Sequence, residues 1–556
     1  MRSACYRPQR LPGDDCMIEH GFGRADISCF ESDMTMMGWG VRTQKVAGVA
    51  EPLHARAVVM RDPANDTRVA FVAVDTLLVT QGLWFGVLDR LAEHPELGLG
   101  AANVILVATH THSGPSGYGH HFWTNLNAPG FSEPVYAGLR DGIVTAIRAA
   151  WKARQSGSVA VAQTVVPLAD GTAFNRSWFA YNRNADVTPV SEARRDEATD
   201  RALTVLCFRD AQGKLSGLVQ WFALHGTMVH ADNRMLHPDH KGLAALALEA
   251  DGLGVVFAQE CCGDVSPNYR WDKKRKHTIG RHDDDFASAA YVAESQVSHT
   301  RRALAGPETP LVGPLEVAVR FVDFSCAVSA AEFNRDGREA TTRPAMLGLA
   351  MAEGTAEGPG PLRNVRALAR TLSRVRGALR GDPKVPFIDL GRGNDGRFGG
   401  VLPMGRLPRF DPVLRWVGDA VRAGGVHGGA WVPHVVPLYL VRLGSFALCA
   451  VPFEMTTVAG RRLRATLREA LPGVTDVVIS TYASAYVGYL TTFEEYQVQH
   501  YEAGYTLFGA HSLGALRSAC ASLAGQLGRA PAAGPEPARV DTAPLARLRF
   551  ARPWAG

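Results

Sequence analysis

The sequence has no long apolar run and no strong excess of charge of one sign. None of its hydrophobic stretches approaches the ~18 residues that a membrane-spanning helix needs. The net charge is +5, from 59 basic and 54 acidic residues, which over 556 residues gives no reason to expect a nucleic-acid partner. The N-terminal stretch also lacks the apolar centre of a secretion signal, so we expect a cytoplasmic protein.

Two common signatures of catalytic or metal sites are also missing. The adjacent Cys261 and Cys262 lack the loop spacing of a zinc knuckle. No Gly-x-Ser-x-Gly elbow surrounds Ser266, so a serine-hydrolase triad is not indicated. The sequence is otherwise 46% hydrophobic and 20% charged, which is the composition of a globular enzyme.

The most informative stretch is 104–115, VILVATHTHSGP. Its apolar, mostly β-branched start predicts a buried strand, and polar residues follow at once. His110 and His112 flank one residue, so on an extended segment both reach the same site. One can bind a metal while the other meets a substrate. The alternative is a pair of structural histidines.

The same pattern of an apolar strand followed by a reactive side chain recurs later in the chain. A strand predicted at 218–224 ends in His225, and Tyr489 and Tyr501 lie beyond the last clear strand. Arg176 follows a turn and is a candidate substrate or oxyanion clamp. Polar residues suited to chemistry follow at least four predicted strands: His110, His225, Ser266 and Glu454.

Several of these residues have competing interpretations. Ser266 can be a nucleophile, a helix cap or a hydroxyl that orients water. We favour His225 as a ligand because a strand fixes its position. The histidines that compete with it lie in loops: His120, His121, His230, His237 and His240.

The alternation of strands and helices predicts an α/β fold. We expect one large catalytic domain with a central mixed β-sheet flanked by helices and an active site at the carboxyl ends of the strands. Residues 1–24 are expected to form a loose arm, 25–514 the catalytic domain, and 515–556 a short tail.

The segment 363–379 predicts an amphipathic helix with arginines on its polar faces. The simpler interpretation is a helix that covers the core, and the alternative is contact with an anionic membrane surface. Its apolar face carries Val365, Leu368, Leu372, Val375 and Leu379.

Two histidines and one carboxylate are a typical catalytic zinc set that leaves room for a water molecule. Zinc lowers the pKa of bound water from ~15.7 to about 7, which makes hydroxide available at neutral pH. Spacing alone cannot assign the ligands, because the candidates are far apart in the sequence.

Six motifs, taken in order, resemble the catalytic domain of the neutral/alkaline non-lysosomal ceramidase family. The resemblance runs from about Ala25 to Gly514. The motifs are MMGWG at 36–40, ATHTHSGP at 108–115, NRS at 175–177, GDVSPN at 263–268, EMTTVAGRRLR at 454–464 and YLTTFEEYQVQHYEAG at 489–504.

The resemblance implies a zinc amidase that splits N-acyl sphingosine into a fatty acid and a sphingoid base. Ser266 falls on the active-site serine of the family, with its role open between nucleophile and water positioning. The implied zinc ligands are His110, His225, Glu454 and Tyr489. The implied polar residues around the scissile amide are His112, Arg176 and Tyr501, with His112 giving the leaving amine its proton.

The chain also differs from the usual family pattern. Trp178, Phe179 and Phe453 are bulkier than the usual residues, and we expect Trp178 and Phe453 to narrow an acyl groove. The C-terminal immunoglobulin-like domain of the family is expected to be absent. One alternative function is cleavage or synthesis of a different N-acyl amide, and a second is non-catalytic lipid binding.

Overall fold

The structure is a computed structural model in which most of the chain is described. The backbone alone is described at 366–370, 412, 413, 416, 547 and 548. The described residues are 17–41, 43–125, 130–358, 360, 366–407, 412–422, 429–529 and 534–548.

The larger sheet has nine strands among the described residues, in the order β13-β11-β10-β8-β1-β4-β5-β6, with β17 paired to β8. The pairs β5–β6 and β11–β13 are parallel and the others are antiparallel, so the sheet is mixed, as predicted. Its strands are β1 (Ile18–Asp26), β4 (His54–Arg61), β5 (Arg68–Val74), β6 (Val104–Ala108), β8 (Gln155–Val165), β10 (Ala202–Asp210), β11 (Leu215–Phe222), β13 (Gly254–Gln259) and β17 (Thr309–Pro310).

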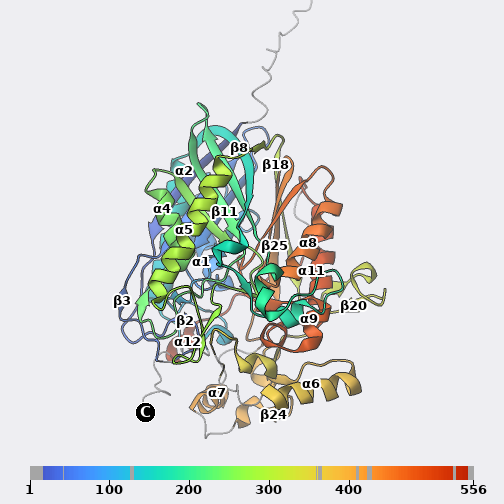
Figure 1. Ribbon diagram of the computed structural model, residues 1–556. Helices are drawn as coiled ribbons and strands as arrows, with labels where there is room; N and C mark the ends of the chain where they lie inside the picture. Colours follow the sequence, from blue (N-terminus) through green and yellow to red (C-terminus); the bar gives the residue numbers. More distant parts are fainter. Residues whose placement is uncertain are drawn as a thin grey trace, which may run out of the picture.

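A smaller mixed sheet packs against the larger one, in the order β18-β25-β26-β28. Figure 1 shows the two sheets beside each other in the middle of the molecule, and the ring of Trp221 in β11 lies 6.1 Å from that of Phe446 in β26. The strands of the smaller sheet are β18 (Leu315–Asp323), β25 (Val435–Leu443), β26 (Phe446–Ala450) and β28 (Asp476–Ser480).

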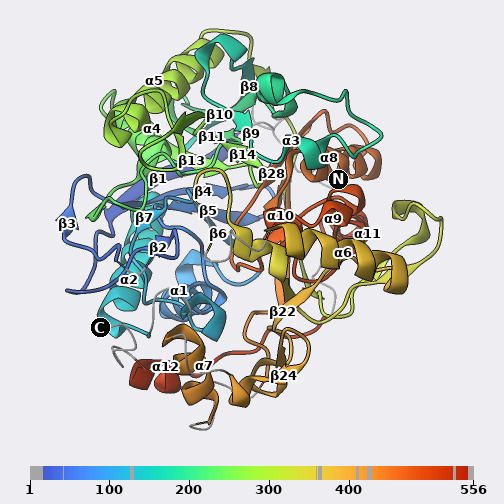
Figure 2. The same ribbon diagram turned by 60° about the horizontal axis from the view of Figure 1, so that its bottom comes forward.

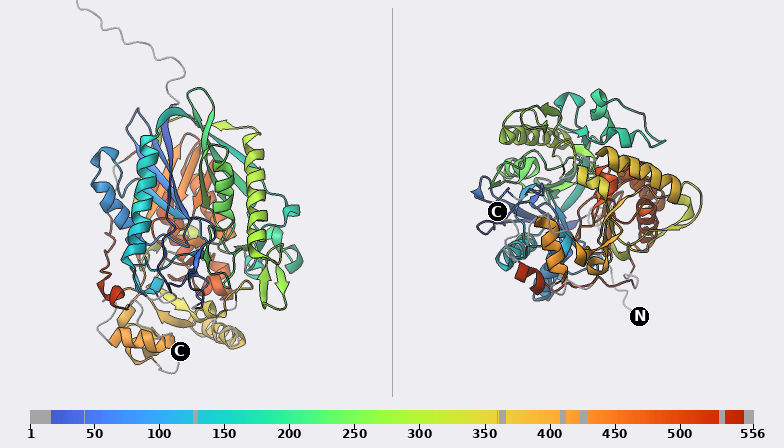
Figure 3. Two further views of the ribbon diagram at one scale, coloured as in Figure 1. Left: turned by 90° about the vertical axis from the view of Figure 1, so that its left-hand side faces the viewer. Right: turned by 90° about the horizontal axis from the view of Figure 1, so that it is seen from below.

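Helices cover the outer face of each sheet, which gives an α/β/β/α arrangement (Figures 1 and 3). α2 (Glu133–Lys152), α4 (Asp239–Glu249) and α5 (Asp285–Leu304) cover the larger sheet, and α8 (Thr457–Ala470) and α11 (Ser512–Ala524) cover the smaller one. In α2, Ser132 caps the first turn, and Val135, Leu139, Ile143 and Ile147, at helical spacing, are buried.

Short elements at one end of the sheets surround the candidate site. Of the segment between β18 and β25, α6, α7 and β24 lie at the bottom of Figure 1, which Figure 2 brings forward, whereas β20 lies at the right beside α11. The remaining elements are α1 (Gln81–Ala92), α3 (Trp178–Tyr181), α6 (Arg366–Arg380), α7 (Pro412–Arg422), α9 (Phe493–Val498), α10 (Tyr501–Gly504), α12 (Ala543–Leu548), β2 (Met37–Gly38), β3 (Gly48–Val49), β7 (Ser113–Gly114), β9 (Phe174–Asn175), β12 (Met235–Leu236), β14 (Val265–Ser266), β15 (Arg270–Asp272), β16 (His277–Ile279), β19 (Val328–Ser329), β20 (Ala340–Thr341), β21 (Met346–Gly348), β22 (Pro386–Asp389), β23 (Arg397–Phe398), β24 (Leu402–Pro403), β27 (Glu454–Met455) and β29 (Tyr489–Leu490).

The predicted N-terminal arm at 1–24 is wrong from Ile18 onward. Residues 18–24 belong to β1, which pairs with both β4 and β8 in the middle of the larger sheet. Gly21 and Gly23 make this strand hard to predict from the sequence, because glycine is depleted in strands. Both are needed, since a side chain at either position would collide with the backbone of α2. Residues 1–16 lie outside the described chain.

The predicted boundary between the catalytic domain and the tail, at 515, cuts through α11. This helix runs on to Ala524 and packs against α8 and the smaller sheet. Leu516, Cys520 and Leu523 are buried in this contact. The local sequence does not show this burial, because it depends on contacts with α8 and the smaller sheet.

The amphipathic segment forms α6, but its apolar side chains do not cover the core. Leu372, Val375 and Leu379 are 42%, 52% and 79% exposed, whereas Ser373 is buried. Val365 and the side chain of Leu368 lie outside the described set. The interpretation as a covering helix is therefore wrong for the described part of the apolar face. No described helix is both long and apolar enough to cross a membrane.

Candidate metal centre and active site

Gln259, the last residue of β13, ties together the strand ends that carry the two candidate histidines. Its side-chain Nε2 donates hydrogen bonds to the carbonyl oxygens of Thr109 at 2.9 Å and Leu224 at 2.6 Å. These residues directly precede His110 and His225 in the chain. A fully buried amide thereby sets the relative position of the two histidines.

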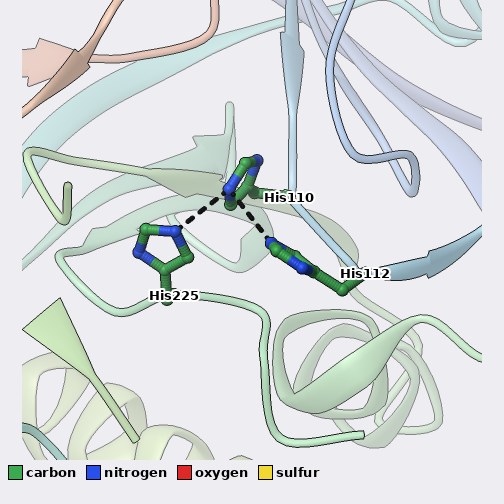
Figure 4. Close-up of side chains that lie close together, drawn as sticks. All are labelled: His110, His112 and His225. Atoms are coloured by element: carbon green, nitrogen blue, oxygen red, sulfur yellow. Dashed lines mark hydrogen bonds between the residues drawn. The ribbon is translucent and has the colours of Figure 1, made fainter. Parts of the chain in front are cut away.

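His110 and His225 point their Nε2 atoms at each other across 3.2 Å (Figure 4). The Nδ1 atom of His110 lies 2.6 Å from the carbonyl oxygen of Leu77, and that of His225 lies 2.8 Å from the carbonyl oxygen of Cys262. An Nδ1–H that donates to a carbonyl leaves a lone pair on Nε2. Two such lone pairs repel each other unless a cation lies between them.

The backbone at His110 is held in an uncommon conformation. Its φ angle is +69°, in the left-handed region that few non-glycine residues adopt. The ring stacks on Tyr482 with centroids 4.2 Å apart. Local strain of this kind persists where the surrounding structure fixes it, and it concentrates at functional sites.

Glu454 brings a carboxylate to the two histidines. Its Oε2 atom lies 3.6 Å from Nε2 of His110 and 3.4 Å from Nε2 of His225. The hydroxyl of Tyr486 donates to Oε1 at 2.6 Å, and that of Tyr482 donates to Oε2 at 3.3 Å. Burial by itself would raise the pKa of Glu454, but the two histidines lower it to about 2, so the carboxylate is ionised.

The spacing of these donor atoms fits a zinc ion. Atoms that bind one zinc tetrahedrally at ~2.0–2.1 Å lie roughly 3.3 Å apart. The separations of 3.2, 3.4 and 3.6 Å between His110, His225 and Glu454 are close to this value.

The charges around the centre also favour a divalent cation. The carboxylates of Glu357 and Glu502 are buried against the guanidinium of Arg176, and that of Glu454 is buried against His110 and His225. Asp264 lies behind them, where burial raises its pKa. Among the described residues the carboxylates of the centre outnumber its one guanidinium, and buried charge is costly unless it is compensated. A divalent cation would balance it.

His112 lies beside His110 and His225, close enough to bind a metal ion itself, whereas the sequence interpretation placed it only at the scissile amide. Its Nε2 atom is 3.4 Å from Nε2 of His110, and His110, His112 and His225 together form a group that can hold a metal ion. Its Nδ1 atom has no hydrogen-bond partner among the described residues. The ring packs edge-on against Trp39, and a side chain in place of Gly38 would lie 2.8 Å from it.

Arg176 is held in the same centre by four groups. Its Nε atom donates to Glu502 at 3.0 Å and Nη1 donates to Glu357 at 3.1 Å. Nη2 donates to the carbonyl of Gly263 at 2.9 Å and to the hydroxyl of Tyr489 at 3.0 Å. The predicted clamp is therefore a buried, fixed guanidinium rather than a surface arginine.

The two predicted tyrosines lie beside Arg176. β27 and β29 pair in parallel with Glu454 opposite Tyr489, which brings the phenol next to the carboxylate. The ring of Tyr501 lies 5.5 Å from that of Tyr489 and 5.7 Å from the guanidinium of Arg176. Burial raises the pKa of both hydroxyls above the ordinary tyrosine value, so both are protonated.

Ser266 is buried where β14 pairs with β9, and β9 leads directly into Arg176. Its Oγ atom accepts a hydrogen bond from the backbone N–H of Asn268 at 2.8 Å and donates to the carbonyl of the same residue at 3.2 Å. These local bonds hold the turn after β14. A role as nucleophile or as water-positioning hydroxyl stays a prediction.

The histidines that compete with His225 have other positions. His230 bonds to Asp285 through Nδ1 at 3.0 Å, and Nε2 of His240 lies 2.8 Å from the carbonyl of His225. The metal group found among the described residues contains none of the competitors: His120, His121, His230, His237 and His240.

Five residues of the centre were missed by the sequence interpretation. Tyr482 and Tyr486 lie in an aromatic-rich run, Glu502 directly follows Tyr501, and Glu357 lies in a glycine-rich loop. Only the adjacency of Glu502 to a motif tyrosine was a usable signal. The missed residues are Gln259, Glu357, Tyr482, Tyr486 and Glu502.

The bulky residues expected to narrow an acyl groove have different surroundings. Trp178 is half-buried at the start of α3, with its ring 5.8 Å from that of Phe179. Phe453 is 1% exposed and packs on Phe324 in the main core, with ring centroids 4.9 Å apart. The expectation that Phe453 lines a groove directly is therefore wrong, because its ring points into the core.

The family model for "Neutral/alkaline non-lysosomal ceramidase, N-terminal" matches residues 19–377 and 420–518. These ranges cover most of the chain and contain every residue of the metal group. The chain therefore belongs to the neutral/alkaline non-lysosomal ceramidase family, as the motifs predicted.

Curated relatives and solved structures agree with this assignment. The chain is 32% identical over 505 residues to a neutral ceramidase of Pseudomonas aeruginosa, covering 89% of this chain and 70% of that one. It is 31% identical over 536 residues to a neutral ceramidase of Mycobacterium tuberculosis, covering 91% and 77%. The solved structure "Ceramidase complexed with C2" matches with a TM-score of 0.76 and 30% identity, covering 94% of this chain and 78% of that chain.

Proposed function

We propose that the protein is a zinc-dependent amide hydrolase that cleaves a ceramide-type N-acyl amide into a fatty acid and a sphingoid amine. The observation that carries the proposal is the arrangement of His110, His225 and Glu454. Their ligand atoms lie 3.2–3.6 Å apart, and both histidines present a lone pair on Nε2. Membership of the ceramidase family supports the choice of substrate.

His110, His225 and Glu454 would hold the zinc ion, and Tyr489 is the fourth ligand that the motifs assign. When bound, zinc would supply an activated water and polarise the amide carbonyl. Tyr482 and Tyr486 hold Glu454 in place, and hydrogen bonds of this kind fix the orientation of a ligating carboxylate.

The other residues of the centre would stabilise the carbonyl oxygen and transfer the proton. The guanidinium of Arg176 and the hydroxyl of Tyr501 would donate hydrogen bonds to the carbonyl oxygen as negative charge develops on it. Four fixed partners hold Arg176, so little reorganisation is needed. Burial lowers the pKa of His112, so its neutral ring would first take a proton from the attacking water or hydroxyl and then give it to the leaving amine nitrogen. Ser266 would act as nucleophile or position the water.

The test is turnover of a series of N-acyl amides by the zinc-loaded protein, with products identified by mass spectrometry. We expect fatty acid and sphingoid base from ceramide, loss of turnover after chelation, and recovery with zinc. Comparison of the parent with Trp178→Ser across acyl lengths would show whether Trp178 narrows the acyl groove. Turnover of another amide with inert ceramides would overturn the substrate, and a zinc-loaded but inactive protein would overturn hydrolysis.

We also propose that α6 contacts an anionic membrane surface, where a lipid-like substrate would be found. Leu372, Val375 and Leu379 form an exposed apolar stripe on this helix, with Arg376 and Arg380 beside it. Apolar side chains flanked by arginines suit the boundary between acyl chains and negatively charged headgroups.

Vesicle sedimentation tests the membrane contact. The parent should bind phosphatidylglycerol vesicles more than phosphatidylcholine vesicles, and Val375→Ser with Leu379→Ser should lose most of this binding. Val165→Ser is the matched control, because Val165 is 59% exposed on β8, away from α6. Equal binding by parent and double variant would contradict the proposal.

A further inference from the structure

Trp123 extends an indole N–H from the loop after β7 to a tyrosine beside the metal centre. It lies in a short 3-10 helix at Phe122–Asn125, and its ring packs edge-on against that of Tyr505 with centroids 5.7 Å apart. Its backbone N–H donates to the carbonyl of Trp431 at 3.1 Å, and the ring of Phe122 packs on that of Trp431 at 4.5 Å. The turn that carries the indole is therefore fixed on the protein.

Three hydrogen bonds lead from this indole to the metal ligand Glu454. Nε1 of Trp123 donates to the hydroxyl of Tyr505 at 2.7 Å. The hydroxyl of Tyr505 forms a hydrogen bond with that of Tyr486, and the two rings lie 6.3 Å apart. The hydroxyl of Tyr486 donates to Oε1 of Glu454 at 2.6 Å. The chain of bonds connects a loop of the larger sheet with a carboxylate that follows the smaller one.

The chemistry of its two ends gives this chain one direction. An indole N–H can only donate, and an ionised carboxylate can only accept. The single hydroxyl hydrogen of Tyr486 goes to Glu454, so this phenol accepts at its oxygen. The bond between the two phenols therefore uses the hydrogen of Tyr505, whose own oxygen accepts from Trp123.

Hydrogen bonds that run in one direction polarise one another. A phenol that accepts a bond becomes a stronger donor, so the indole N–H strengthens the bond that Tyr486 makes to Oε1 of Glu454. That bond leaves Oε2 as the oxygen that faces the histidines, 3.6 Å from Nε2 of His110 and 3.4 Å from Nε2 of His225. The orientation of the carboxylate therefore depends on a side chain that does not touch it.

We propose that Trp123 is a positioning residue for Glu454 and acts on it through the two phenols of Tyr505 and Tyr486. This inference rests on the proposed zinc site and extends the hydrogen bonding behind one of its ligands. Direct partners of a metal ligand usually change metal affinity about 10–100-fold. A donor two hydroxyls further away should contribute less, roughly 3–10-fold.

The experiment measures the zinc affinity of the full chain by competition with a chelator. Trp123→Phe removes the donor, keeps an aromatic ring and should weaken zinc binding ~3–10-fold. Tyr505→Phe breaks the chain one step closer to the ligand and should weaken it at least as much. In a Tyr486→Phe background, where the chain is already cut, both changes should alter the affinity less than ~2-fold.

Trp431→Phe is the matched control. The ring of Trp431 is fully buried beside Phe122, but its Nε1 donates to the side-chain oxygen of Asn394 at 3.3 Å instead of to a tyrosine of the chain. This variant should keep the zinc affinity of the parent. Melting temperature, measured on every variant, excludes loss of the fold as the cause of weaker binding.

Unchanged zinc affinity in Trp123→Phe would overturn the proposal. Equal losses with and without the hydroxyl of Tyr486 would overturn it as well, because they would mean that Trp123 only packs the loop. A parent that binds no zinc would instead refute the proposed metal site, so the two failures are distinguishable.

Discussion

The two sheets contribute different chemistry to the same centre. The larger sheet supplies nitrogen donors, His110 after β6 and His225 after β11, whereas the smaller sheet supplies oxygen donors, Glu454 after β26 and Tyr489 after β28. A metal ion bound by both sets would join the two sheets. The centre therefore exists only when the sheets are packed together, and metal binding should stabilise that packing.

The two sheets also support their ligands differently. Backbone carbonyls of Leu77 and Cys262 hold the histidines, and no substitution of a side chain removes a carbonyl. Side-chain hydroxyls of Tyr482 and Tyr486 hold Glu454. A mutation of a supporting residue should therefore change the position of Glu454 more easily than the positions of the two histidines.

The largest expected effect is loss of the metal when either sheet loses a ligand. His110→Ala, His225→Ala and Glu454→Ala should each abolish zinc binding in elemental analysis, with no measurable turnover. His112→Ala should keep zinc and lose about 10²–10⁴-fold in kcat, the usual contribution of a general acid. Full zinc retention in His110→Ala and His225→Ala would refute the ligand assignment, and zinc loss in His112→Ala would make it a ligand.

A smaller effect is expected from the tyrosines behind Glu454. Tyr486→Phe removes the 2.6 Å hydrogen bond to Oε1 and should weaken zinc affinity about 10–100-fold, measured by competition with a chelator. Tyr482→Phe removes a 3.3 Å bond and is the comparison, with a smaller loss expected. Unchanged affinity in both variants would mean that the carboxylate is positioned by the metal alone.

The smallest expected effect is a loss of stability when the side-chain amide of Gln259, which bonds to the residues before His110 and His225, is removed. Gln259→Leu leaves the carbonyls of Thr109 and Leu224 unpaired and should lower the free energy of unfolding by about 1–3 kcal/mol for each. Gln220→Leu in β11 is the control, because the buried side-chain amide of Gln220 has no hydrogen-bond partner among the residues that the structure describes. It should be neutral or stabilising in denaturant unfolding, and equal losses in both would contradict this role of Gln259.

Local sequence pattern predicted most strands, the strand-end positions of the candidate histidines and carboxylate, and the mixed α/β class. It placed His110, His225 and Glu454 near one another because they come a few residues after the ends of β6, β11 and β26, and chain continuity keeps each of them close to its strand end. It failed for β1, where Gly21 and Gly23 are explained only by the approach of α2. It also failed for the boundary within α11, whose burial depends on the smaller sheet.

The sequence by itself determined which residue types stand at the ends of the strands and, through its motifs, the family. Only the tertiary structure decided that Glu357 and Glu502 flank Arg176, that Tyr486 holds Glu454, and that His112 lies 3.4 Å from His110. The physical reason is that hydrogen bonds and ion pairs are selected by distance in space. These partners come from distant segments, and no local periodicity records the packing of two sheets that brings them together.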